Sequence, residues 1–134
     1  MTDKVYVIPC SGIGKATGSV GREATYRVVD DMIPDKADTM CLALLTKGDP
    51  EAIEEMKSSK VITIDGCARD CTRKNVELSG GKPDVNHRVQ DFMKKHRDLK
   101  PGSVLDIGEG GWGLVDIMAE QIADEVDELF GGGE

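Results

Sequence analysis

Residues 61–74 read VITIDGCARDCTRK and join a strand pattern directly to a helix pattern. The first four residues, Val, Ile, Thr and Ile, form a short β-branched run that is typical of a buried strand. Asp65 and Gly66 give a turn signal, and the residues that follow contain neither Gly nor Pro until Gly80. We therefore expect a helix that opens at Cys67 and ends near Gly80.

A second strand pattern lies near the start of the chain. Residues 4–8, KVYVI, are rich in β-branched residues and are closed by Pro9, and a glycine-rich stretch follows over residues 11–21. Between Ser19 and Ile33, apolar residues then recur every four positions until Pro34: Val20, Ala24, Val28 and Met32. This order predicts a buried first strand and an amphipathic helix.

Further elements follow along the chain. Asp49, Pro50 and Glu51 supply an N-cap, a proline at the first helical position and a favourable acid, which predicts a helix over 50–58. The segment 40–45 is apolar but too short to classify. The remaining patterns predict a short strand over 85–90, a polar helix over 91–97, a turn at 101–102, an apolar run at 104–107, a glycine loop over 108–113, an amphipathic helix over 113–130 and a disordered tail over 131–134.

Strands that alternate with helices predict an α/β fold with a largely parallel sheet. We expect a doubly wound, Rossmann-like or flavodoxin-like arrangement with helices flanking the sheet. The 134 residues fit one small domain, which we expect over residues 1–130, and a hydrophobic content of 39% is enough for a core.

Charge and hydropathy narrow the classes of function. The net charge of −8 argues against attraction to nucleic acid or to anionic lipid, and the five aromatic residues are too scattered to stack bases. No apolar run approaches the length of a membrane span, and the first residues lack a signal-peptide pattern. We therefore expect a cytoplasmic protein with no nucleic-acid or membrane partner, in which cysteines stay reduced.

The four cysteines are Cys10, Cys41, Cys67 and Cys71. Cys10 follows the first strand and Cys67 follows the strand at 61–64, so both are expected at the carboxyl edge of a parallel sheet, where ligands collect. On a helix that opens at Cys67, Cys71 would lie one turn further along the same face. The helix N-terminus would favour the thiolate of Cys67, and Arg69, Arg73 and Lys74 would add positive charge.

A zinc ion held by four thiolates is the first hypothesis, because the cysteine count matches a tetrahedral shell. The spacing matches no standard zinc finger. Cys41 reaches the site only if segment 40–45 is a loop or a helix, since an upward strand would start it at the opposite edge. Buried, inert thiols are the simpler alternative for each cysteine taken alone.

Several of these residues carry a resemblance. The sequence IDGCARDC at 64–71 resembles the motif that names the DGC-domain family of predicted zinc-binding proteins, with PCSG at 9–12, Gly21-Arg22 and CLA at 41–43 in the usual order. The resemblance covers roughly residues 5–81. It implies a small α/β domain in which Cys10, Cys41, Cys67 and Cys71 are the potential metal ligands, with no established biochemical role.

Other polar residues have simpler interpretations. The stretch Gly12–Gly18 after the first strand permits binding of a small molecule or an anion, although it departs from both the Walker A and dinucleotide patterns. We expect His87 to be a satisfied core histidine and His96 to be solvated. Asp65 is expected to cap the helix that follows it. Trp112 is expected to pack against the last helix.

Two other classes of function remain open. Four thiolates equally suit an iron–sulfur cluster in an electron-transfer protein. A thiol enzyme that handles sulfur or disulfides would use Cys67 to attack and Cys71 to resolve, although the pair lacks the usual redox spacing. Whether the chain is an enzyme is not decided by its sequence.

Overall fold

The computed structural model describes residues 4–9, 16–40, 42–66, 70–103 and 106–132. Four strands form one all-parallel sheet: β1 (Val5–Pro9), β2 (Ala37–Asp38), β3 (Val61–Asp65) and β4 (Val85–Arg88). Their order is β2-β1-β3-β4, which is the order of the first four strands of a flavodoxin-like sheet. The predicted α/β class with a parallel sheet is confirmed.

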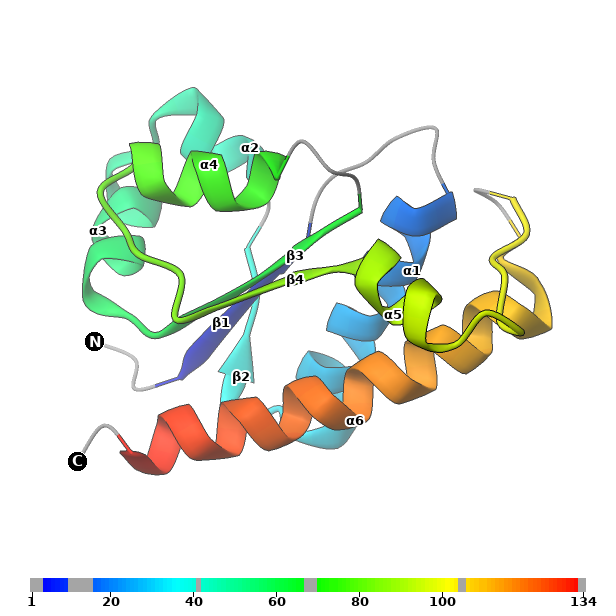
Figure 1. Cartoon of the computed structure of the whole chain (residues 1–134). Helices are drawn as coiled ribbons and strands as arrows, with labels where there is room; N and C mark the ends of the chain where they lie inside the picture. Colours follow the sequence, from blue (N-terminus) through cyan, green and yellow to red (C-terminus); the bar gives the residue numbers. More distant parts are fainter. Residues whose placement is uncertain (1–3, 10–15, 41, 67–69, 104–105, 133–134) are drawn as a thin grey trace.

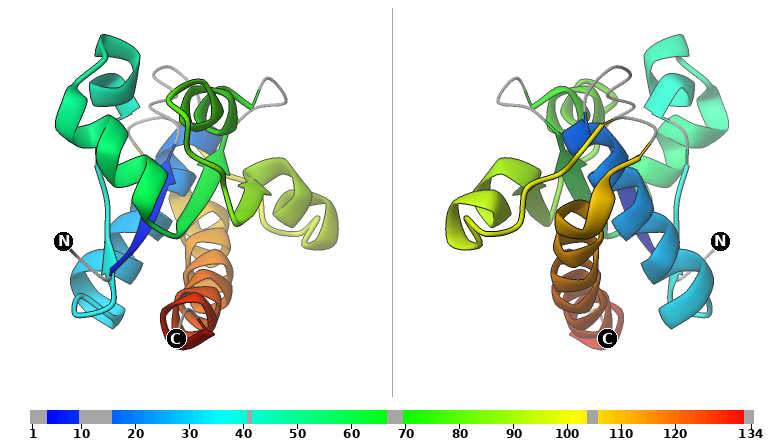
Figure 2. Two further views of the ribbon diagram at one scale, coloured as in Figure 1. Left: turned by 90° about the vertical axis from the view of Figure 1, so that its left-hand side faces the viewer. Right: turned by 90° about the vertical axis from the view of Figure 1, so that its right-hand side faces the viewer.

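Helices cover both faces of this sheet (Figure 1). One layer holds α2 (Leu42–Lys47), α3 (Pro50–Ser58) and α4 (Cys71–Leu78). The other holds α1 (Ala16–Tyr26), its π-helical continuation η1 (Arg27–Met32), α5 (Val89–Lys95) and α6 (Gly108–Gly132). The two side views in Figure 2 show α2–α4 and α6 on opposite sides of the strands.

Each face of the sheet buries its own core because side chains alternate along the strands. On one face, Val7 and Ile62 pack with residues of α1, α5 and α6. On the other, Ile8 and Val61 pack with residues of α2, α3 and α4. Central strands that are buried on both faces explain why residues 5–8 and 61–64 are almost continuously apolar.

Several element boundaries differ from the sequence prediction. The strand β2 was missed because it has only two residues, and most of segment 40–45, which could not be classified, belongs to α2. The predicted helix over 19–33 begins earlier, at Ala16, and its last six residues are π-helical. The predicted opening of a helix at Cys67 is wrong, because Asp70 has a left-handed backbone (φ 53°) and α4 begins after it, at Cys71.

The C-terminal third also shows a difference. The glycines at 108–113 were expected to form a loop, but they begin α6, which continues to Gly132 and thus through the first half of the predicted disordered tail. Gly111 and Gly113 permit this because a Cβ atom at either position would meet the side chain of Ile107 or Leu99 at 2.9 Å or less. Close packing of this first turn explains why glycines stand in a helix despite their low propensity.

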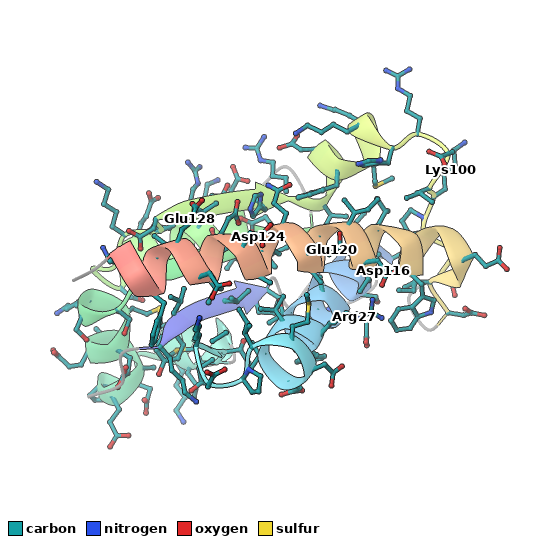
Figure 3. The ribbon with its side chains drawn as sticks, turned by 90° about the horizontal axis from the view of Figure 1, so that it is seen from below. Arg27, Lys100, Asp116, Glu120, Asp124 and Glu128 are labelled. Carbon is teal, nitrogen blue, oxygen red and sulfur yellow. The ribbon has the colours of Figure 1, made fainter. Side chains whose placement is uncertain are left out.

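The outer face of α6 is acidic. Asp116, Glu120, Asp124 and Glu128 follow one another at four-residue spacing and lie along the helix in Figure 3. Arg27 of η1 forms an ion pair with Asp116. No described helix is both long and apolar enough to cross a membrane.

Candidate metal centre

The candidate centre lies at the carboxyl edge of the sheet, where β1 and β3 end side by side. Pro9, the last residue of β1, pairs with Ile64, and β3 ends one residue later at Asp65. In sequence, Cys10 follows Pro9 directly and Cys67 comes two residues after Asp65. Cys10, Cys41 and Cys67 lie outside the described residues, whereas Cys71 is described and half-buried at the first position of α4.

Cys41 follows the same pattern as the other cysteines. β2 runs parallel to β1 and ends at Asp38, three residues before Cys41 in sequence. The helix α2 begins at the next residue, Leu42, and packs against α4. The segment after Cys41 is therefore a helix and not a strand. From the sequence, Cys41 was expected to reach the other cysteines only if this segment is a loop or a helix.

Asp65 fixes the beginning of α4 from the end of β3. Its carboxylate is fully buried and accepts hydrogen bonds from the backbone N–H of Thr72 at 2.7 Å and of Arg73 at 3.4 Å. The Thr72 hydroxyl donates to the carbonyl of Ile64 at 3.3 Å. The prediction that Asp65 caps the following helix is confirmed, although it acts across five intervening residues and not as the adjacent N-cap.

Gly66 brings β3 into direct contact with the first turn of α1. A Cβ atom at this position would lie 2.9 Å from the amide nitrogen of Gly18 and 3.2 Å from the carbonyl carbon of Thr17. Those neighbours are backbone atoms, which no change of rotamer can move aside. Glycine at this place in the DGC sequence therefore allows a close approach of two backbones.

Asp70, the residue before Cys71, is bound by two arginines. Its side chain is 4% exposed, and Arg88 at the end of β4 holds both carboxylate oxygens, with Nε donating to Oδ1 at 2.7 Å. Arg73 adds a contact at 3.3 Å. The hydrogen bond from Arg88 lowers the pKa of the Asp70 carboxyl below its ordinary value, although burial opposes this shift.

Asn86 connects β4 to the other aspartate of the motif. Its amide donates to the Thr63 hydroxyl at 2.6 Å and to the Asp65 carboxylate at 3.2 Å. Neither Asn86 nor Arg88 was predicted from the sequence to be part of the site. Their alternation with Val85 and His87 did indicate that they share a face of β4, but the aspartates they bind are 21 and 18 residues away in sequence.

His87 lies on the opposite face of β4 from Asn86 and Arg88 and contacts α5 and α6. Its Nε2 lies 2.6 Å from a carboxylate oxygen of Glu125 in α6, and its ring lies against Phe92 with centroids 5.4 Å apart. The prediction of a satisfied histidine is confirmed. Trp112 was expected to pack against the last helix, but it is part of that helix and is 43% exposed, with the Arg27 guanidinium over its ring.

Comparison with known families identifies the family of the chain. The family model described as the DGC domain matches residues 6–108, which is well over half of the chain. The chain belongs to the DGC-domain family. In this DGC domain the match continues past Gly81, where the sequence resemblance stopped, to the first residue of α6. No curated protein and no solved structure matches the chain.

Proposed function

We propose that this DGC domain binds one zinc ion through the thiolates of Cys10, Cys41, Cys67 and Cys71. The observation that carries the proposal is the topology of the sheet. β1, β2 and β3 are neighbouring parallel strands, and in sequence a cysteine follows the end of each within three residues. The fourth, Cys71, begins the helix after β3.

The chemistry of the donors supports zinc. Four thiolates satisfy the tetrahedral preference of this ion with no remainder. The first position of α4 favours a thiolate on Cys71 through the helix dipole. The Nε atom of Arg73, two residues after Cys71 in sequence, is buried without a hydrogen-bond partner among the described residues, and an anionic ligand within reach would satisfy its N–H.

The described residues alone do not form a metal site. Among them, no three His, Cys, Asp or Glu side chains come together in a way that would hold an ion. The nearby acids are engaged with protein donors, since Asp65 caps α4 and Asp70 binds Arg88. The proposal therefore depends on the cysteines and is tested through them.

The test is the zinc content of single serine variants of the full chain. Cys67→Ser and Cys71→Ser should each lose most of the metal, because a three-thiolate shell binds zinc far more weakly. Cys41→Ser should do the same if all four thiols bind. Full zinc in Cys41→Ser would reduce the set to three cysteines, and full zinc in both Cys67→Ser and Cys71→Ser would refute the proposal. His87→Gln is the control and should keep its metal, since His87 binds Glu125 on the other face of β4.

A further inference from the structure

Cys71 is held from both sides by residues that are themselves bound to the edge strand β4. On one side, the Asp70 carboxylate accepts hydrogen bonds from two nitrogen atoms of the Arg88 guanidinium. On the other, the N–H of Thr72 donates to Asp65, which also accepts from Asn86. The two aspartates are almost completely buried, at 0% and 3% exposed, so these hydrogen-bond partners take the place of water around their carboxylates.

We propose that Arg88 and Asn86 are positioning residues for Cys71. They fix the two aspartates that define where α4 begins, and the position of the thiol follows from that start. The contacts of Arg88 with Asp70 and of Asn86 with Asp65 do not require a metal ion. Only the consequence for zinc affinity rests on the function proposed above.

The backbone at Asp70 makes the role of Arg88 specific. A left-handed conformation is uncommon for any residue other than glycine, and it is what starts the helix at Cys71 and not earlier. The side chain of Asp70 makes no capping hydrogen bond to α4. Its carboxylate instead binds Arg88 in a two-bond geometry that a lysine cannot reproduce.

β4 offers a matched control in adjacent positions. Residues 86 and 88 face α4, whereas residue 87 faces α6, because side chains alternate along a strand. Arg88→Met removes the contact to Asp70 and keeps much of the side-chain volume. His87→Gln, one residue away, disturbs the contact between β4 and α6 and leaves both aspartates bound.

The first readout is amide hydrogen exchange at Thr72 and Arg73 in metal-free protein. In Arg88→Met these amides should exchange at least about tenfold faster, because Asp70, the residue before α4, loses its hydrogen bonds from Arg88 and the first turn of the helix opens more often. Arg88→Lys should recover part of the protection. His87→Gln should lower the unfolding temperature without changing exchange at these two amides.

The second readout is zinc affinity, measured by competition with a chromophoric chelator. Arg88→Met should bind zinc about 10–100-fold more weakly, as is typical when a group that orients a ligand is removed. Asn86→Ala should weaken it in the same direction, and His87→Gln should match the wild type.

The outcomes separate the two proposals. If the wild-type chain binds no zinc, the proposed metal site is refuted. Faster amide exchange in folded Arg88→Met would then still support the positioning role. Unchanged exchange and unchanged zinc affinity in folded Arg88→Met would overturn the positioning role and leave the zinc site standing. If Arg88→Met does not fold, Arg88→Lys decides, and wild-type exchange and affinity in that variant would overturn the inference.

Discussion

Gly66→Ala is the substitution whose effect follows most directly from the structure. The new methyl group would lie 2.9 Å from the Gly18 nitrogen, 3.1 Å from its Cα and 3.2 Å from the carbonyl carbon of Thr17. All three are backbone atoms of the first turn of α1. The overlap can be relieved only if α1 and the end of β3 move apart.

Overpacking of this kind costs about 1–3 kcal/mol of unfolding free energy. For a chain of this length, 1 kcal/mol corresponds to a shift of about 3.5 °C in the unfolding temperature. We therefore expect Gly66→Ala to unfold about 4–10 °C below the wild type. Gly66 directly precedes Cys67 in sequence, so the zinc content should fall as well if Cys67 binds zinc as proposed.

Thermal unfolding followed by far-UV circular dichroism measures this shift, and Gly21→Ala is the control. Gly21 is also buried and also in contact with β3, but its added Cβ would lie 3.2 Å from a side-chain methyl of Ile64, which can adjust. Inside α1 the alanine also gains helix propensity, so its net effect should be small. Equal unfolding temperatures for Gly66→Ala and the wild type would refute the close backbone approach.

Three further predictions concern charge and metal. Because the pKa of Asp70 is lowered in the folded state, the stability that its carboxylate contributes is present above about pH 4 and is lost as the pH falls through the lower folded value. The difference in unfolding free energy between wild type and Asp70→Asn should therefore shrink from about pH 6 to about pH 2. A difference that stays constant over this range would contradict the prediction. Glu120→Lys replaces the repulsion of Glu120 by Asp116 and Asp124, four residues away on either side, with attraction, and should raise the unfolding free energy by about 0.5–1 kcal/mol in denaturant at low salt. No gain would show that the acidic side chains on the outer face of α6 do not repel one another measurably. Chelation should speed amide exchange over residues 10–18 and 66–71 while residues 114–129 stay protected, because the buried stripe of α6 needs no thiolate; uniform loss of protection would show that the metal organises the fold.

The sheet could be predicted because its central strands carry a strong local signal. Residues 5–8 and 61–64 are buried on both faces and so consist almost entirely of apolar side chains. β2 carries no such signal, since it has two residues and depends on its pairing with β1. The start of α6 was missed for a related reason, because the glycines there are selected by contacts with Leu99 and Ile107 and not by local propensity.

The candidate site was predicted in part. Asp65 was expected to cap the next helix and does so, because acids are common at such positions. The start of α4 could not be read from the sequence, since residues 67–79 contain no glycine or proline to mark it. The helix begins after the left-handed turn at Asp70, whose carboxylate binds Arg88 at the end of β4. A pairing between residues 18 positions apart leaves no periodic pattern in one sequence.

Metal analysis with an absorption spectrum on anaerobically purified wild-type protein tests the proposed zinc site most directly. We expect about one zinc per chain and a colourless sample, as is typical of a four-thiolate zinc site. Strong absorbance at about 400 nm with matching iron and sulfide would instead identify an iron–sulfur cluster and contradict the zinc assignment. A metal-free protein that takes up no added zinc while its thiols are reduced would contradict the metal site altogether.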